Sequence, residues 1–163
     1  MEFQFPPNGI ERASGEQYSG TVQVVANYLD PTIYQGASSM PGDLLAVSSD
    51  IEEVGLRSFG VMGVELISAT GELLQVASDK EVGLSFPVPT DLMTAAPEEI
   101  SLWSFDEERY GVWIEEGTAT RDGSRYVGTV SHFSFWSGSV SFPVVKVSGQ
   151  LQSATGIPVG LRL

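Results

Sequence analysis

The sequence predicts an all-β fold, an antiparallel β-sandwich of about eight strands. Glycine (18 residues) and proline (9 residues) interrupt the 163-residue chain at short intervals. The runs between them are short and rich in valine, leucine, phenylalanine and tyrosine, as in sandwiches and barrels. No segment shows the apolar period of about 3.6 residues that marks an amphipathic helix. An apolar content of 42% provides enough side chains for a hydrophobic core.

The expected strands begin with residues 20–28, where Val22 and Val24 share one face while Thr21 and Gln23 share the other. Residues 60–67 carry apolar side chains on both faces, as expected of a central strand. The remaining expected strands are residues 44–47, 73–77, 82–87, 101–105, 111–116 (reaching 119) and 126–136, with a further pair at 144–151 and 159–163.

Turn residues mark the ends of several of these strands. Gly71 within residues 69–72 predicts a hairpin turn between strands 60–67 and 73–77. The pair Asp122 and Gly123 predicts a second hairpin turn at residues 121–124, because such turns need a positive φ. Asp30 and Pro31 predict the turn that ends the first strand.

A single helical turn is expected between residues 89 and 99. Thr90 or Asp91 would serve as its N-cap, because both side chains can accept a hydrogen bond from the first free amides.

The composition changes near residue 138. Ser137, Gly138 and Ser139 predict a flexible break, so the chain is divided into a β-sandwich domain at 1–138 and a second part at 139–163. In this second part, the pattern Val-x-Gly-x-Leu (147–151) followed by Gly-x-Pro-Val (156–159) resembles the opening of a carboxypeptidase-regulatory-like module. Residues 139–163 are therefore a linker and the first strands of a following module, or else the terminal strands of the same domain.

The net charge of −13, from 21 acidic and 8 basic residues, bounds the partners. Such a surface repels phosphate backbones and anionic lipid, which excludes nucleic acid as a partner. No apolar run approaches the roughly 18 residues of a membrane span, so membrane insertion is not expected. The absence of cysteine excludes disulfides, thiolate zinc sites and cysteine nucleophiles. Glycine-rich nucleotide-binding patterns are missing, so no cofactor is predicted.

An acidic stretch surrounds Arg109. Its spacing does not match a calcium-binding loop, so we interpret these residues as solvated turn charges and predict no metal site. A glycosidase pair would require a cleft and a set separation, which the sequence does not define. The acidic residues concerned are Asp106, Glu107, Glu108, Glu115 and Glu116.

The three tryptophans, Trp103, Trp113 and Trp136, lie in expected strands and are interpreted as core residues. Their alternative role is a platform that stacks on sugars, which would make the chain a carbohydrate-binding module.

His132, Phe133 and Ser134 contain the only histidine of the chain. In a continuous strand 126–136, His132 and Ser134 would share a face. His132 could then accept the hydroxyl proton of Ser134 while the oxygen attacks the carbonyl of Phe133, converting that peptide to an ester that water cuts. The alternative is that all three residues belong to an ordinary sheet core.

Three motifs carry a family resemblance: Leu-Trp-Ser-Phe-Asp at 102–106, Gly-Val-Trp-Ile-Glu-Glu-Gly at 111–117 and His-Phe-Ser-Phe-Trp at 132–136. With the order of the other motifs across residues 3–138, they resemble a bacterial surface-protein domain similar to the cartilage-intermediate-layer type of extracellular domain. A more distant resemblance is to the ZU-type β-sandwich of ankyrins and netrin receptors.

The resemblance implies a sandwich that packs against neighbouring modules of an exported bacterial protein, located outside the cell, on its surface or in the periplasm. The implied partners are adjacent domains of the parent protein or another surface protein. The expected function is that of a non-catalytic structural or interaction module. Some ZU-type domains cut themselves within His-Phe-Ser, which here implies a single-turnover cleavage of Phe133–Ser134 with Ser134 as nucleophile and His132 assisting.

Overall fold

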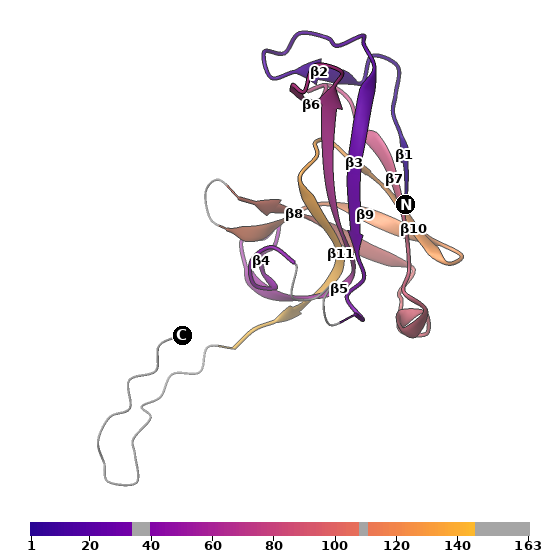
Figure 1. Cartoon of the computed structure of the whole chain (residues 1–163). Helices are drawn as coiled ribbons and strands as arrows, with labels where there is room; N and C mark the ends of the chain where they lie inside the picture. Colours follow the sequence, from indigo (N-terminus) through magenta and orange to yellow (C-terminus); the bar gives the residue numbers. More distant parts are fainter. Residues whose placement is uncertain (34–39, 108–110, 146–163) are drawn as a thin grey trace, which may run out of the picture.

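The computed structural model describes residues 1–33, 40–107 and 111–145, and nearly all of its regular structure is β (Figure 1). The short 3-10 turn η1 (Thr90–Leu92) is the one helical element among these residues. The all-β prediction is therefore confirmed. The strands are β1 (Glu2–Gln4), β2 (Ile10–Arg12), β3 (Val22–Leu29), β4 (Leu45–Val47), β5 (Glu53–Ser68), β6 (Leu73–Val76), β7 (Val82–Pro87), β8 (Glu99–Asp106), β9 (Val112–Asp122), β10 (Arg125–Val130) and β11 (Phe135–Pro143).

The strands form one hydrogen-bonded network in the order β1-β7-β10-β9-β8-β11-β5-β6-β2. β3 pairs with β5, and β4 pairs with β5 and, in parallel, with β9. In Figure 1, β3, β5 and β6 run along the length of the molecule while β8, β9 and β10 cross it. The network thus folds over into a sandwich, because strands from its two halves bury their inner faces against each other.

The main core lies between these halves. Phe86 of β7 and Tyr126 of β10 come from one side, and Phe59 of β5 and Trp136 of β11 come from the other, all of them buried. The rings of Phe59 and Tyr126 meet edge-on with centroids 5.9 Å apart. Aromatic side chains of this size contribute most of the apolar area in such a core.

A second, smaller core occupies the opposite face of β5 and β8. It holds Val61, Trp103 and Trp113 together with Ala46 of β4. Neighbours along each strand alternate between the two cores: Leu102 lies in the first and Trp103 in the second. β8 and the first part of β5, as far as Met62, are therefore covered on both faces. From Gly63 on, one face of β5 is open at Gly63, Glu65 and Ile67, so the two-sided burial expected for residues 60–67 holds only in part.

Several predicted elements are confirmed. β7 has the predicted bounds, and the two hairpin turns contain Gly71 and Gly123 with φ values of 86° and 60°. Asp30 ends β3 in a turn, where its carboxylate accepts a hydrogen bond of 2.8 Å from the amide of Thr32. The helical turn is present, but its N-cap is Pro89 and neither of the residues expected there.

The continuous strand expected at 126–136 is wrong. The chain leaves β10 after Val130 and begins β11 at Phe135. β10 pairs with β7 and β9, whereas β11 pairs with β5 and β8. Residues 131–134 must therefore carry the chain from one part of the sheet to another, and an unbroken strand cannot do so.

The flexible break expected at residues 137–139 is also wrong. Ser137 and Ser139 are fully buried in β11, where their hydroxyls lie 2.7 Å apart, and Ser137 also meets Ser58 at 3.1 Å. β11 continues to Pro143 and pairs with β5 throughout. Small side chains serve here to fit a central strand between two others. Residues 146–163, including most of the expected strands at 144–151 and 159–163, lie outside the described part, so the following module stays a prediction.

Candidate functional site

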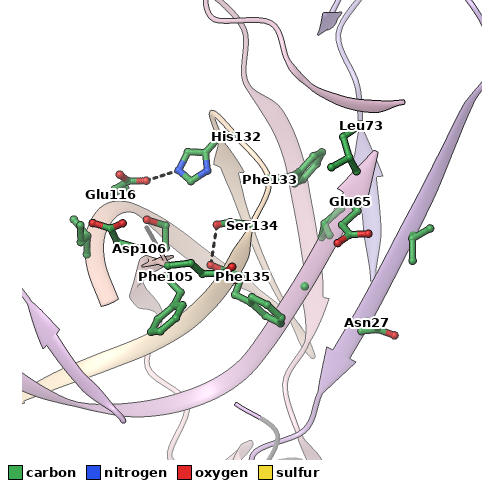
Figure 2. Close-up of a pocket in the computed structure, with 16 residues that line it drawn as sticks. Asn27, Glu65, Leu73, Phe105, Asp106, Glu116, His132, Phe133, Ser134 and Phe135 are labelled. Atoms are coloured by element: carbon green, nitrogen blue, oxygen red, sulfur yellow. Dashed lines mark hydrogen bonds and ion pairs between the residues drawn. The ribbon is translucent and has the colours of Figure 1, made fainter. Parts of the chain in front are cut away.

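The connection 131–134 borders a hollow of about 800 Å³ between the two parts of the sheet (Figure 2). β3, β5 and β6 form one wall of it, and β8, β9 and the connection form the other. The hollow is lined by Val25, Asn27, Gly63, Val64, Glu65, Leu73, Ser104, Phe105, Asp106, Glu107, Ile114, Glu116, His132, Phe133, Ser134 and Phe135.

His132 is held from two directions. Its Nε2 lies 2.8 Å from Oε2 of Glu116 on β9, and its ring centroid lies 5.0 Å from that of Trp136. The indole N–H of Trp136 donates to the main-chain carbonyl of His132 at 3.1 Å. The His132 side chain is 43% exposed, so the imidazole borders solvent and is not a core group.

Ser134 is tied to the strand that follows it. Its hydroxyl donates to the carbonyl of Phe135 at 3.2 Å, and its own carbonyl accepts a hydrogen bond from the amide of Val64 at 3.2 Å. The second contact begins the pairing of β11 with β5. Both bonds hold Ser134 directly ahead of the first pair of β11 with β5, Phe135 opposite Gly63.

Phe133 anchors the connection to the N-terminus. Its ring meets those of Phe3 and Phe5 edge-on, at centroid distances of 5.6 and 5.9 Å. This three-ring cluster packs against the main core beside β1. The connection is thus fixed at each of its three last residues.

The structure brings His132 and Ser134 to the same hollow but not into contact with each other. Each makes its hydrogen bond to another group, Glu116 for the imidazole and Phe135 for the hydroxyl (Figure 2). No residue of the connection has a positive φ. The shared strand face expected for the pair is absent because these residues do not lie in a strand.

The acidic residues have separate structural tasks where the structure describes them. Glu115 accepts hydrogen bonds from the Ser101 hydroxyl (2.6 Å) and the Ser49 amide (3.0 Å), joining β9 to β8 and to the loop after β4. Burial raises the pKa of Glu115, but these hydrogen bonds outweigh it and the pKa lies below its usual value. Asp106 and Glu107 line the hollow, while Glu108 and Arg109 lie outside the described residues.

All three tryptophans are buried, with at most 1% of their surface exposed. Their predicted place in the core is confirmed, and a sugar-stacking platform built from them is excluded. The indole N–H of Trp103 donates to the carbonyl of Ser139 at 3.3 Å, which links the smaller core to β11.

The described part of the chain has neither a metal-binding cluster nor a membrane-spanning helix. In residues 1–33, 40–107 and 111–145, no three histidine, aspartate or glutamate side chains gather where they could hold a metal ion. No helix of this described part has the length and apolar character needed to cross a membrane.

Sequence reasoning missed Glu116 as the partner of His132 and missed Glu65, Val25 and Leu73 as the facing wall. The Glu-Glu pair at 115–116 carries no local signal for this role. Glu116 is the extra residue of a β-bulge: Leu102 pairs with Gly117 and Trp103 with Glu115, so no residue of β8 lies opposite Glu116.

The sequence is similar to those of cartilage intermediate layer proteins 1 and 2. The chain is 35% identical over 124 residues to cartilage intermediate layer protein 2 of Homo sapiens and 30% identical over 124 residues to that of Mus musculus, matching 76% and 75% of the chain. Cartilage intermediate layer protein 1 of Homo sapiens is 30% identical over 120 residues, or 71% of the chain.

The chain spans about a tenth of the length of these relatives, 10% in each case. No family model matches the chain, and no solved structure matches it. The similarity together with the all-β fold makes this chain a domain homologous to one segment of the cartilage intermediate layer proteins.

Proposed function

We propose that the chain is a non-catalytic structural and interaction module of an exported bacterial multidomain protein, distantly related to ZU-type domains. Its place would be outside the cell, at the cell surface or in the periplasm. Its partners would be adjacent domains of the parent protein or another surface protein. The relatives' much greater length supports a role as one module among several.

One observation carries this proposal: the groups that could perform chemistry are used as structural contacts. The imidazole of His132 binds Glu116, and the hydroxyl of Ser134 binds the carbonyl of Phe135. The ring of Phe133 lies in an aromatic cluster with the N-terminal strand. Together these residues join β9, β11 and β1.

The test is the stability of the backbone at this connection. The purified chain is incubated for days at neutral pH and then separated on a denaturing gel. A non-catalytic module stays in one band. Fragments that appear with time, and are absent from a Ser134→Ala variant, would overturn the proposal.

Self-cleavage at Phe133–Ser134 is a second candidate, favoured by the Glu116–His132 pair beside Ser134. A base oriented by a carboxylate, close to a hydroxyl, is the arrangement of activated nucleophiles. The Ser134 oxygen would bond to the Phe133 carbonyl carbon as the Phe133–Ser134 amide bond breaks, and the hydroxyl proton would pass through His132 to the new amine. Water would then hydrolyse the ester, leaving a carboxylate at Phe133 and restoring the hydroxyl.

Hydroxylamine tests this candidate, because it cleaves the ester at Phe133; the other bond that it can cut, Asn8–Gly9, gives a fragment beginning at Gly9, which mass spectrometry distinguishes from one beginning at Ser134. Self-cleavage predicts fragments whose yield rises with hydroxylamine and falls in a Glu116→Gln variant. Glu99→Gln is the matched control, since Glu99 is an exposed strand carboxylate that does not line the hollow. The absence of a hydroxylamine-dependent cut between Phe133 and Ser134 excludes the candidate.

A further inference from the structure

The outer edge of β3 is a feature that the proposed role as a structural and interaction module does not yet explain. β3 pairs with β5 along its whole length, from Val22 opposite Ser68 to Leu29 opposite Val61. No strand within the described residues pairs with its other edge. Four of its residues (Gln23, Val24, Val25 and Asn27) are exposed and none is buried. A strand in this position presents a row of free amides and carbonyls.

Devices that usually protect such an edge are absent from β3. Its sequence contains no charged residue and no proline, and its register with β5 has no bulge. Natural proteins commonly place lysine, proline or a bulge on exposed edges to prevent unwanted pairing. An unprotected edge of 8 residues therefore indicates a strand that is meant to be covered.

The hollow lies directly beside this edge. Val25 and Asn27 of β3 line it, and Val25 stands opposite Glu65 of β5. Leu73 of β6 and Phe133 complete an apolar floor, with Leu73 64% exposed and Val25 36% exposed. A segment added to β3 would place alternate side chains over this floor, since successive residues of a strand point to opposite faces.

The acidic residues of the hollow indicate which kind of partner fits the edge of β3. Glu65 makes no ion pair with any described basic side chain, and Glu107 and Glu116 also line the hollow. A second copy of this chain would bring its own net charge of −13 and its own Glu65 to the contact. Like charges across an interface disfavour that pairing, whereas a cationic partner is attracted.

We propose that β3 accepts an extended basic segment of a partner protein as an added strand, with a lysine or arginine reaching Glu65 and an apolar side chain resting on Val25 and Leu73. Main-chain hydrogen bonds would supply most of the affinity, and the side chains over the hollow would supply the selection. The inference rests on the proposed interaction role and names the partner's chemistry.

The probe is a capped 8-residue peptide, Lys-Thr-Val-Thr-Lys-Thr-Val-Thr, matched to the length of β3. In an extended strand its lysines and valines share one face, as Glu65 and Val25 do, and its threonines share the other. One control peptide has glutamate in place of each lysine, and another has proline in place of each threonine, which keeps the charge but removes half of the amide donors. Binding is measured by fluorescence anisotropy, and hydrogen exchange locates the contact. We expect the lysine–valine peptide alone to bind and to slow exchange in residues 22–29, while β10 is unaffected.

Two variants sharpen the result. Glu65→Gln should weaken binding about threefold at low ionic strength, as expected for the loss of one exposed ion pair. Glu99→Gln is the control, because it removes an exposed strand carboxylate outside the hollow. Val25→Lys places a cation opposite Glu65 on the edge itself, so it should weaken binding more than Glu65→Gln does.

Three results would overturn the inference: no binding by the intact chain, equal binding of the glutamate peptide, or protection of β3 by self-association without peptide. The first would leave the non-catalytic role in place. A chain that cuts itself at Phe133–Ser134 would overturn that role whatever the peptides do, so the two failures are distinguishable.

Discussion

Replacing Gly138 by alanine tests whether β11 is the packed central strand that the structure describes. Gly138 is buried between Gly60 of β5 and Leu102 of β8. A Cβ at this position would lie 2.3 Å from Cζ of Phe86 and 2.9 Å from Cδ1 of Ile100. Both side chains are buried, so neither can turn into solvent to make room. We expect a loss of about 3 kcal/mol, the upper end of the usual overpacking cost.

Thermal unfolding followed by circular dichroism measures this loss. For a domain of about this size, each kcal/mol lowers Tm by about 2–4 °C, so Gly138→Ala should lower it by about 6–12 °C. Gly117→Ala is the matched control, because its Cβ would meet its nearest neighbours, Cβ of Leu102 and the carbonyl oxygen of Thr129, at an ordinary 3.9 Å. It should change stability by no more than about 0.5 kcal/mol.

A double variant separates this clash from a general sensitivity of the strand. Phe86→Leu removes the ring atoms nearest to the new methyl group. The loss of stability that Phe86→Leu causes should therefore be smaller in the Gly138→Ala chain than in the parent chain. If Gly138→Ala lowers Tm no more than Gly117→Ala does, the packing argument for residues 137–139 is refuted.

Three further predictions concern the site and its support. Glu115→Gln should lower the free energy of unfolding at neutral pH but not in acid. Because folding lowers the pKa of Glu115, its carboxylate stabilises the fold above the unfolded-state pKa, and this effect is lost as the pH falls through the folded-state pKa. Urea titrations at several pH values would detect the difference. Trp136→Phe should cost about 2 kcal/mol, from the lost hydrogen bond to the His132 carbonyl and the smaller ring, and an unchanged urea midpoint would contradict this. Phe133→Ala should cost about 2 kcal/mol and speed amide exchange in β1, whereas unchanged exchange there would show that the aromatic cluster does not hold the N-terminus.

The alternation of apolar and polar residues predicted those strands whose buried and exposed faces follow that alternation in the structure. β7 alternates buried and half-buried residues from end to end, and its bounds could be read from the sequence. Gly71 and Gly123 marked their turns because the backbone there requires a positive φ. β1 and β2 were missed because each has 3 residues with a single apolar side chain, whereas the equally short β4 is an apolar run.

The errors arose where pairing partners, not local pattern, decide the structure. Residues 126–136 alternate without interruption, yet the chain changes partners at His132 and the strand ends. Ser137, Gly138 and Ser139 have the composition of a linker, but a central strand under Phe86 needs small side chains at this point. Composition alone cannot distinguish these two reasons for small residues.

The candidate site was predicted in part. The spacing of His132 and Ser134 predicted that the two side chains lie near each other, and both line the same hollow. The partner of His132 could not be assigned, since Glu116 lies 16 residues earlier and meets it only through the way β9 and the connection are folded. The wall formed by β3 and β6 depends in the same way on long-range pairing with β5.

The central claim is that His132, Phe133 and Ser134 form a structural connection in an intact chain. Denaturing mass spectrometry of the purified protein, recorded before and after prolonged incubation, tests it most directly. The account predicts one species with the 17.5 kDa mass of the whole chain at every time point. Two species that add up to that mass plus one water, with the smaller one beginning at Ser134, would contradict it.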